Sequence, residues 1–153
     1  MPTINELQDE IIEEFSALDD WMDRYALIID LGNTLDPLPE SDKTPTNLIE
    51  GCQSRVWITA SFDGERVHFR GESDALIVKG IVSLLLRVLD AQTPQDILSS
   101  DLYFIERIGL AEHLSPTRSN GLVSMLRQMR LFAAPFASSF NLQLTLKVII
   151  AAS

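Results

Sequence analysis

The spacing of apolar residues changes twice along this chain, and each change limits what a segment can form. Between residues 4 and 18, Ile, Leu and Phe recur every three or four positions, the period of an amphipathic helix. Apolar and polar residues alternate over residues 56–62, and again over 67–70 after the turn-forming pair Asp63-Gly64. After residue 73 the helical spacing returns. The sequence therefore predicts a β-hairpin with helices before and after it.

The segments before the hairpin carry helix and loop signals. Thr3 and Glu6 have the spacing of a capping box at the start of the first helix. A second helix is predicted from Asp20, and Gly32 is expected to end it in the left-handed conformation that costs glycine little. Three prolines interrupt residues 33–47, so this stretch is predicted to be a loop.

The segments after the hairpin are predicted to be mainly helical. Ser73 is in position to cap a strongly apolar helix over about residues 74–89. Thr93-Pro94 and Ser115-Pro116 each place a capping side chain before a proline, which suits the first helical position because its missing amide is not needed there. Pro135 is expected to end or kink the last helix.

The chain is predicted to consist of one domain and a short tail. Its 153 residues suit a single domain, which we place at residues 1–138. In the tail, residues 139–153, leucines alternate with other residues, which indicates a strand without a hairpin partner beside it. Three interpretations of the tail stay open: a docked extra strand, a dimer contact or a disordered end.

The composition is that of a chain that folds in a reducing compartment. Hydrophobic residues make up 46% and charged residues 22%, as in ordinary globular proteins. The single cysteine allows no internal disulfide, and the acidic first residues lack a basic and apolar leader, so a cytoplasmic location is predicted. The longest uncharged stretch, residues 131–146, is shorter than the roughly 20 apolar residues of a membrane helix. No membrane partner is therefore expected.

The charge of the chain argues against a nucleic-acid partner. The formal net charge is −10, which repels a phosphate backbone. Residues 1–24 hold eight acids, which are interpreted as a solvated helix face. Four arginines between residues 105 and 130 are the more suggestive feature: Arg107, Arg118, Arg127 and Arg130. A protein partner is predicted.

Cys52 is the only cysteine, so any sulfur chemistry of this chain runs through its thiol. Two interpretations are open at this point: a small buried apolar residue, or a reactive thiol in a glycine-flanked loop. A thiolate is the reactive form, and with a free pKa of about 8.5 only a small fraction is ionised at neutral pH. A reactive Cys52 would therefore need positive charge or amide dipoles nearby.

Few residues qualify as activators of this thiol. Arg118 and the amide end of the helix that Ser115 caps are the candidates with positive character. His68 and His113 are the two possible imidazole bases. His68 is expected on the outer face of a strand as a plain surface residue, whereas His113 precedes the Ser115 helix and is the better candidate. No phosphate loop, HExxH or GxSxG motif is present.

Five ordered segments resemble the SufE family of sulfur acceptors. They are IIDLG (28–32), LDPLP (35–39), NLIEGCQSRVW (47–57), SDALIVKG (73–80) and GLAEHLSPTRSNGL (109–122). The resemblance runs from near residue 5 to about residue 135. It implies an α+β fold of the SufE and IscU type, in which helices pack around a small antiparallel sheet of about three strands, the third over residues 47–50.

The resemblance also implies a function. SufE-like proteins accept a sulfane sulfur from the persulfide of a cysteine desulfurase of the SufS or CsdA type, stimulate that enzyme, and pass the sulfur to an iron–sulfur scaffold of the SufB type. Cys52 matches the acceptor thiol. No cofactor is expected on this chain, because pyridoxal phosphate belongs to the desulfurase, and no metal site is expected. The chain would act as a monomer or weak homodimer.

The other residues of the expected site have supporting roles. Gly51, Gln53 and Ser54 match the family's loop and would shape the surroundings of the thiol. Asp74 would lie at the junction of hairpin and helix, with a plain helix-start role as the alternative. Arg118 would favour the thiolate or dock the desulfurase, with a surface salt bridge as the alternative.

Two other functions compete with the carrier. One is a hydrolase or transferase built on Cys52 and His113. The other is an activator that changes the desulfurase by docking alone.

Overall fold

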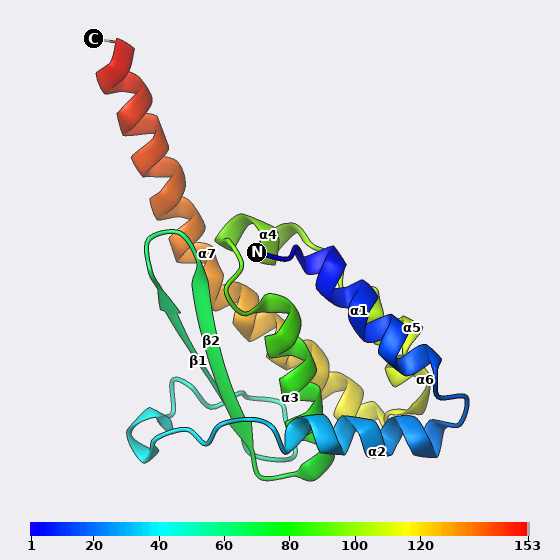
Figure 1. Cartoon of the computed structure of the whole chain (residues 1–153). Helices are drawn as coiled ribbons and strands as arrows, with labels where there is room; N and C mark the ends of the chain where they lie inside the picture. Colours follow the sequence, from blue (N-terminus) through cyan, green and yellow to red (C-terminus); the bar gives the residue numbers. More distant parts are fainter. Residues whose placement is uncertain (153) are drawn as a thin grey trace.

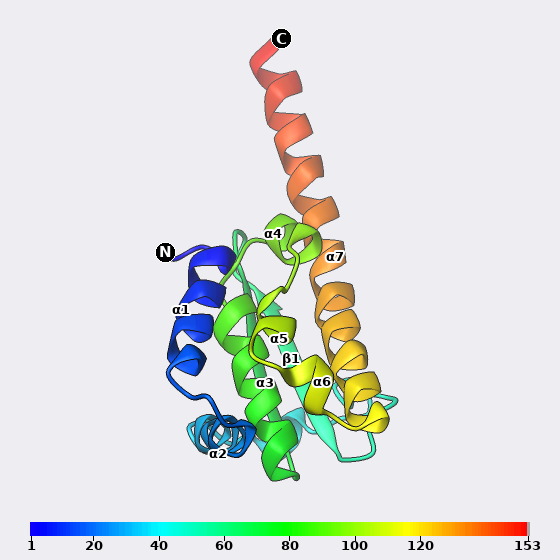
Figure 2. The same cartoon turned by 90° about the vertical axis from the view of Figure 1, so that its right-hand side faces the viewer.

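Helix α3 (Leu76–Leu89) is the element around which the rest of the molecule packs. In this computed structural model the chain is described from residue 1 to 152, and side chains from residue 1 to 137. α3 buries apolar residues on more than one face: Ile77, Val78, Ile81, Val82, Leu84, Leu85, Val88 and Leu89. α2 packs on one side of it and the hairpin on another, as Figures 1 and 2 show. The strongly apolar sequence of α3 thus predicts its central position correctly.

The first two helices form as their sequences predict. α1 (Ile4–Ser16) begins after Thr3, whose hydroxyl accepts a hydrogen bond from the Glu6 amide at 3.1 Å. α2 (Trp21–Gly32) begins after Asp20, whose carboxylate accepts from the Met22 amide. Three acids of α1 contact other elements: Glu14 forms a bidentate pair with Arg87 of α3, Glu10 lies 3.8 Å from the same guanidinium, and Asp9 accepts from the Tyr103 hydroxyl. The pair of Glu14 and Arg87 ties α1 to the central helix.

Gly32 is required by packing, and the predicted left-handed cap is wrong. Gly32 is the last residue of α2 and does not have a positive φ. A Cβ atom on Gly32 would lie 2.6 Å from the backbone nitrogen of Gly80. A Cβ on Gly80 would in turn collide with the carbonyl oxygen of Ile28. The two glycines therefore let α2 and α3 cross with their backbones in contact.

The hairpin consists of β1 (Val56–Phe62) and β2 (Val67–Ser73), paired from Val56 opposite Ser73 to Phe62 opposite Val67. The expected third strand is reduced to one bridge between Leu48 and Trp57, so the sheet of the described chain has two strands. The amides of Asn47 and Leu48 both donate to the Thr44 carbonyl in a turn, and Gly51 has a positive φ, so pairing is limited to this short stretch.

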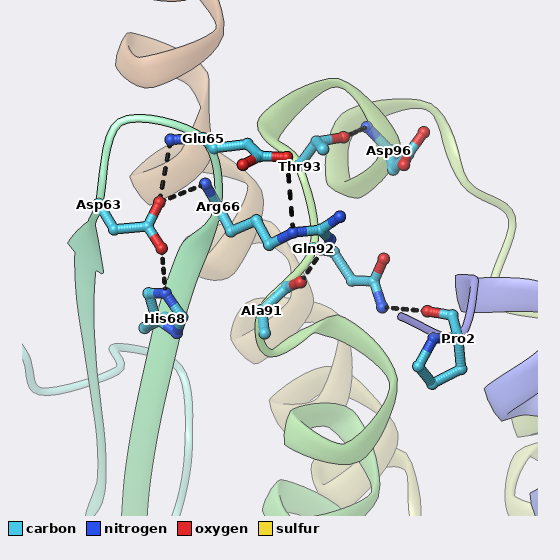
Figure 3. A network of polar contacts seen from close by, with 9 residues as sticks. All are labelled: Pro2, Asp63, Glu65, Arg66, His68, Ala91, Gln92, Thr93 and Asp96. Atoms are coloured by element: carbon cyan, nitrogen blue, oxygen red, sulfur yellow. Dashed lines mark hydrogen bonds and ion pairs between the residues drawn. The ribbon is translucent and has the colours of Figure 1, made fainter.

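Polar contacts hold the tip of the hairpin against the following loop (Figure 3). Asp63 accepts from the amides of Glu65 and Arg66 and contacts His68 Nε2 at 2.7 Å. The backbone hydrogen bonds lower the pKa of Asp63, with a further contribution from His68. The Arg66 guanidinium donates to the carbonyl of Ala91. His68 is thus a half-exposed residue of β2 that binds the adjoining turn.

Three short helices connect α3 to the last helix. α4 (Pro94–Ser99) begins after Thr93, whose hydroxyl accepts from the Asp96 amide, as predicted. α5 (Phe104–Arg107) and α6 (Leu110–His113) are one-turn helices separated by Gly109, which has a φ of 89°. The predicted loop over residues 33–47 contains one 3₁₀ turn, η1 (Glu40–Asp42).

α7 (Pro116–Ala152) is longer than predicted. Ser115 caps its first turn by accepting from the Arg118 amide at 3.3 Å. The helix continues through Pro135, so the predicted end at that residue is wrong, and so is the predicted strand in the tail. A strand needs a partner for its backbone groups, whereas a helix satisfies them internally, and Leu and Ala are good helix formers. The last part of α7 extends away from the other elements (Figures 1 and 2).

Candidate functional site

Cys52 lies in the loop between the Leu48 bridge and β1, where it contacts α7. Its thiol is half-buried and lies 3.7 Å from the carbonyl oxygen of Gly121, to which it donates a weak hydrogen bond. Gly51 has a φ of 86°, a backbone conformation that residues with a side chain rarely adopt. A Cβ atom on Gly51 would lie 2.9 Å from Ser124 Oγ. The loop therefore approaches α7 closely at two successive residues.

The other end of this loop is held by the junction of β2 and α3. The Ser73 hydroxyl donates to the Arg55 carbonyl at 2.9 Å, and the Asp74 carboxylate accepts from the Arg55 amide at 3.1 Å. α3 begins at Leu76 without a side-chain cap. Ser73 is therefore not the cap residue of α3, although its hydroxyl also accepts a hydrogen bond from the Ala75 amide at 3.3 Å. Asp74 lies at the junction of hairpin and helix, two residues before α3 begins. Both side chains bind the backbone three residues after Cys52.

A cavity of about 110 Å³ opens beside the thiol. Cys52, Gln53 and Ser54 line it from the loop, and Arg118 lines it from the first turn of α7. Its remaining lining residues come from α3 and α7: Val78, Ile81, Thr117, Gly121 and Met125. A single water needs about 10–15 Å³, so the cavity has room for a further heavy atom on the sulfur. Larger surface hollows exist, such as one of about 370 Å³ lined by Asp96 and Tyr103, but Cys52 does not line them.

The surroundings of Cys52 favour the protonated thiol. Burial raises the pKa of Cys52, because a thiolate loses more hydration energy than a thiol. The contact with α7 is at Gly121, more than one turn from Pro116, and it is made to a carbonyl oxygen. The amide end of this helix was predicted to activate the thiol, but the sulfur makes no direct contact with it. In this arrangement the thiol is stored in its unreactive form.

Arg118 lines the same cavity as Cys52, and its side chain is exposed. It takes part in no ion pair among the side chains of residues 1–137, so the salt-bridge interpretation is not supported there. Two other arginines of the sequence cluster have separate surroundings. Arg130 donates to the carbonyls of Ile97 and Ser100, and Arg107 lies over the Tyr103 ring.

Neither histidine is in the lining of the Cys52 cavity. His113 stacks on Trp21 with ring centroids 4.2 Å apart, and its Nδ1 lies 2.9 Å from the Gly109 carbonyl oxygen. These contacts place His113 between α6 and α2. The structure therefore brings together Cys52, Gln53, Ser54 and Arg118, with Gly51 and Asp74 positioning the loop, and leaves His113 in a packing role.

Sequence reasoning missed the residues of α3 and α7 that form the rest of the site. Gly121 and Thr117 fall within the GLAEHLSPTRSNGL segment, so the resemblance itself was a usable signal. Ser124 is outside the five segments, and its contact with Gly51 follows only from how α7 crosses the loop.

Comparison with known proteins identifies the family. The sequence profile described as SufE, Fe-S metabolism associated domain, matches residues 9–133, most of the chain. The chain belongs to the SufE family. Its tail after residue 133 lies outside the match, and the domain boundary at residue 138 stays a prediction.

The fold of this SufE-family chain is also that of a solved structure. A hypothetical protein from Thermus thermophilus, whose structure was determined in solution, superimposes with a TM-score of 0.71 at 21% sequence identity. The match covers 86% of this chain and 96% of the other. The α+β fold class is thereby confirmed, with two strands in the sheet of the described chain.

Family membership indicates a role in Fe–S metabolism. Within the described residues, no helix is long and apolar enough to cross a membrane. The described residues also contain no group of three or more His, Cys, Asp or Glu side chains placed to hold a metal ion.

Proposed function

We propose that this SufE-family chain is a sulfur carrier: Cys52 accepts a sulfane sulfur from a cysteine desulfurase and delivers it to an iron–sulfur scaffold. The observation that supports this most directly is the chain's only thiol, half-buried in a loop beside a cavity that has room for one more sulfur atom. The family's role in Fe–S metabolism agrees with this proposal.

The transfer is a thiol exchange. The Cys52 thiolate attacks the outer sulfur of the donor persulfide, a new S–S bond forms at Cys52, and the S–S bond of the donor breaks. The donor cysteine leaves as a thiolate. The outer sulfur moves with its proton, and no external oxidant or reductant is needed. The sulfur then leaves Cys52 by the same reaction with an acceptor thiol of the scaffold.

A single cysteine suits this relay. A second thiol in the same chain would attack the loaded persulfide and release its sulfur as sulfide, leaving a disulfide. This chain has no second cysteine. The cavity residues Val78, Ile81 and Met125 supply apolar surface next to the sulfur, which limits access of external thiols.

Because burial raises the pKa of the Cys52 thiol, part of the activation of this thiol has to come from the partner desulfurase. A buried thiol reacts slowly, so the loop of Gly51 to Arg55 would have to leave α7 before transfer. Loop movement breaks the Gly121 contact and the three hydrogen bonds of the Arg55 backbone, which is inexpensive compared with moving a helix. Arg118, exposed at the rim of the cavity, is then available to contact the desulfurase. Pyridoxal phosphate would be held by that enzyme.

The intact mass of the chain tests this proposal. After incubation with a cysteine desulfurase, pyridoxal phosphate and cysteine, we expect a gain of one sulfur atom that maps to Cys52 and is removed by reductant. Cys52→Ser should gain none while still binding the desulfurase. A matched serine variant away from the cavity, Ser61→Ala at an exposed position of β1, retains the thiol and should load normally. Sulfur on the Cys52→Ser chain would refute the proposal.

The two competing functions are distinguished by activity measurements on further variants. An activator that works by docking alone predicts that Cys52→Ala stimulates the desulfurase as well as the original chain. A hydrolase built on Cys52 and His113 predicts loss of activity in His113→Gln. The stacking of His113 on Trp21, outside the Cys52 cavity, argues against the hydrolase.

A further inference from the structure

An apolar groove lies between α4 and the exposed side of α7, two elements that pack side by side (Figure 2). Three of its apolar side chains are exposed: Leu98 at 39%, Val123 at 55% and Leu131 at 57%. Leu126 and Ala134 complete the apolar lining, and the hollow measures about 360 Å³. Exposed apolar side chains gathered along one hollow indicate a contact with another molecule.

Arg130 holds the two walls of this groove together. Its guanidinium donates to the carbonyls of Ile97 and Ser100 at 3.4 and 2.7 Å. These carbonyls lie at the end of α4, where a helix has no partners of its own for them. Arg130 therefore fixes α4 beside α7. A groove that is already formed loses little freedom when a partner binds in it.

The charged side chains that line the groove are both basic. They are Arg127 and Arg130, and no Asp or Glu is among the lining residues. Arg127 is exposed and takes part in no ion pair among the side chains of residues 1–137. Glu50 shares a neighbouring hollow with Arg127, and Asp96 of α4 lines a different one. The groove thus combines an apolar floor with an unpaired guanidinium.

The lining residues of α7 form one stripe that suits another helix. Val123, Arg127, Arg130, Leu131 and Ala134 follow one another at the spacing of a single helix face. The stripe is about 17 Å long, which is about three helical turns. A second helix fits such a groove by placing apolar residues at positions i, i+3 or i+4, and i+7 along it.

Charge distinguishes the possible occupants. The chain has a net charge of −10, so an anionic lipid surface would repel it. A second copy placed groove to groove would bring two Arg127 side chains together. The acidic helix α1 of another copy is also unsuitable, because its apolar residues Ile4, Ile11 and Phe15 are buried in the core. A partner helix that carries carboxylates meets none of these obstacles.

We propose that the groove between α4 and α7 binds an amphipathic helix of a partner protein. The apolar face of that helix covers Leu98, Val123 and Leu131, and a carboxylate beside this face pairs with Arg127. The apolar contacts supply most of the affinity, because they remove exposed hydrocarbon from water. The carboxylate selects the partner and its direction in the groove.

This groove is separate from the Cys52 site. Gly121 and Met125, which line the Cys52 cavity, are each two residues from Val123, which places them about 200° around the helix axis from it. A helix in the groove would therefore leave the thiol accessible, and the partner could stay bound during sulfur transfer. Since the groove contains no part of the thiol cavity except their common helix, either proposal can fail without the other.

Fluorescence anisotropy with a designed peptide tests the proposal. The probe is a fluorescein-labelled helix of about 12 residues, enough to span the groove, with leucines at helical spacing and glutamates beside them. A covalent bridge on its outer face keeps it helical, because a free helix of this length is marginal in water. We expect saturable binding to the full chain that weakens with added salt. Leu131→Gln should raise Kd at least about ten-fold.

An exchange of charges tests the role of Arg127. A second peptide carries lysines in place of the glutamates. The original chain should prefer the glutamate peptide at least about ten-fold, and Arg127→Glu should prefer the lysine peptide, because the sign of the contact is reversed. Arg70→Glu is the matched control: it makes the same change in net charge at an exposed position of β2 outside the groove, and should keep the original preference.

Further controls show that the variants are intact. Leu131 and Arg127 are exposed, so their variants should fold, as circular dichroism would check. Met22→Gln, at a residue 67% exposed on α2, is the control for Leu131→Gln and should not change Kd. The rate of Cys52 alkylation by iodoacetamide should be the same in the groove variants as in the original chain.

Four results would overturn the proposal. One is that neither peptide binds the chain. Another is that the original chain binds both peptides equally, or that Arg127→Glu keeps the original preference. The third is a dimer of the chain that Leu131→Gln dissociates, which would show that a second copy covers the groove. The fourth is cosedimentation with phosphatidylserine vesicles that Leu131→Gln abolishes, which would make the groove a lipid contact.

Discussion

At the scale of single residues, the environment of Cys52 differs from that of an activated thiol. The nearest polar partner of the sulfur is a carbonyl oxygen, and burial raises the pKa of the thiol. Arg118 lines the cavity from an exposed position without offsetting this effect. The residue is therefore protected at rest, and its reactivity depends on whether the loop stays on α7.

The pH dependence of Cys52 alkylation follows from this burial. Because the pKa of the folded chain is raised, the iodoacetamide rate should reach its midpoint at a higher pH in the native protein than in urea. By the same linkage, the raised pKa contributes stability below the pKa of the unfolded thiol, and this is lost as pH rises through the folded pKa. If the pH midpoint of the iodoacetamide rate were lower in the native protein than in urea, this would indicate a thiolate activated by Arg118.

Asp74 controls how firmly the loop is held. Asp74→Ala removes the acceptor of the Arg55 amide, a hydrogen bond of about 1 kcal/mol. If the loop opens more often by that amount, alkylation of Cys52 at fixed pH should become about five-fold faster. Asp63→Ala is the matched control, since it removes an acceptor of backbone amides at the hairpin tip. An unchanged rate in Asp74→Ala would show that other contacts hold the loop.

At the scale of elements, the crossing of α2 and α3 brings two helix backbones into direct contact. It depends on Gly32 and Gly80, whose added Cβ atoms would both meet backbone atoms of the facing helix. Backbone cannot move aside as a side chain can, so the separation of the two helices is set by these residues.

Gly80→Ala should therefore destabilise the protein although alanine is the better helix former. The gain in helix propensity is about 1 kcal/mol, whereas overpacking against the Ile28 carbonyl costs about 1–3 kcal/mol or more. We expect a lower urea midpoint. Gly121→Ala on α7 is the control, because its Cβ would meet only Cys52, with Sγ nearest at 3.4 Å, and its midpoint should not fall. Equal midpoints for both variants would mean that the helices separate easily.

The elements also differ in how far their sequences specify them. Thr3, Thr93 and Ser115 cap their helices as predicted, because capping depends on residues within one turn. Gly32 was assigned a local role although its role is a contact with a distant helix. The tail was misassigned as a strand because alternation of residues does not show whether a partner strand is present.

At the scale of the whole molecule, charge and apolar surface are unevenly distributed. The acids lie in residues 1–112, and the thiol cavity and the exposed apolar groove both lie along α7, where acids are absent. One helix thus supplies part of the Cys52 site on its buried side and part of an apolar groove, with Leu98 of α4, on its exposed side. The proposed sulfur transfer would use the buried side of α7.

The sequence by itself determined the hairpin, the capped helices, the central position of α3 and the single thiol, because periodicity, capping and residue identity are local properties. Only the tertiary structure decided that Gly51 lies against Ser124, that Asp74 binds Arg55 and that His113 stacks on Trp21. These contacts join residues far apart in the chain, and they depend on how the helices pack. The sequence therefore showed which residue carries the thiol, whereas the burial of this thiol, its raised pKa and its neighbours could not be predicted from the sequence.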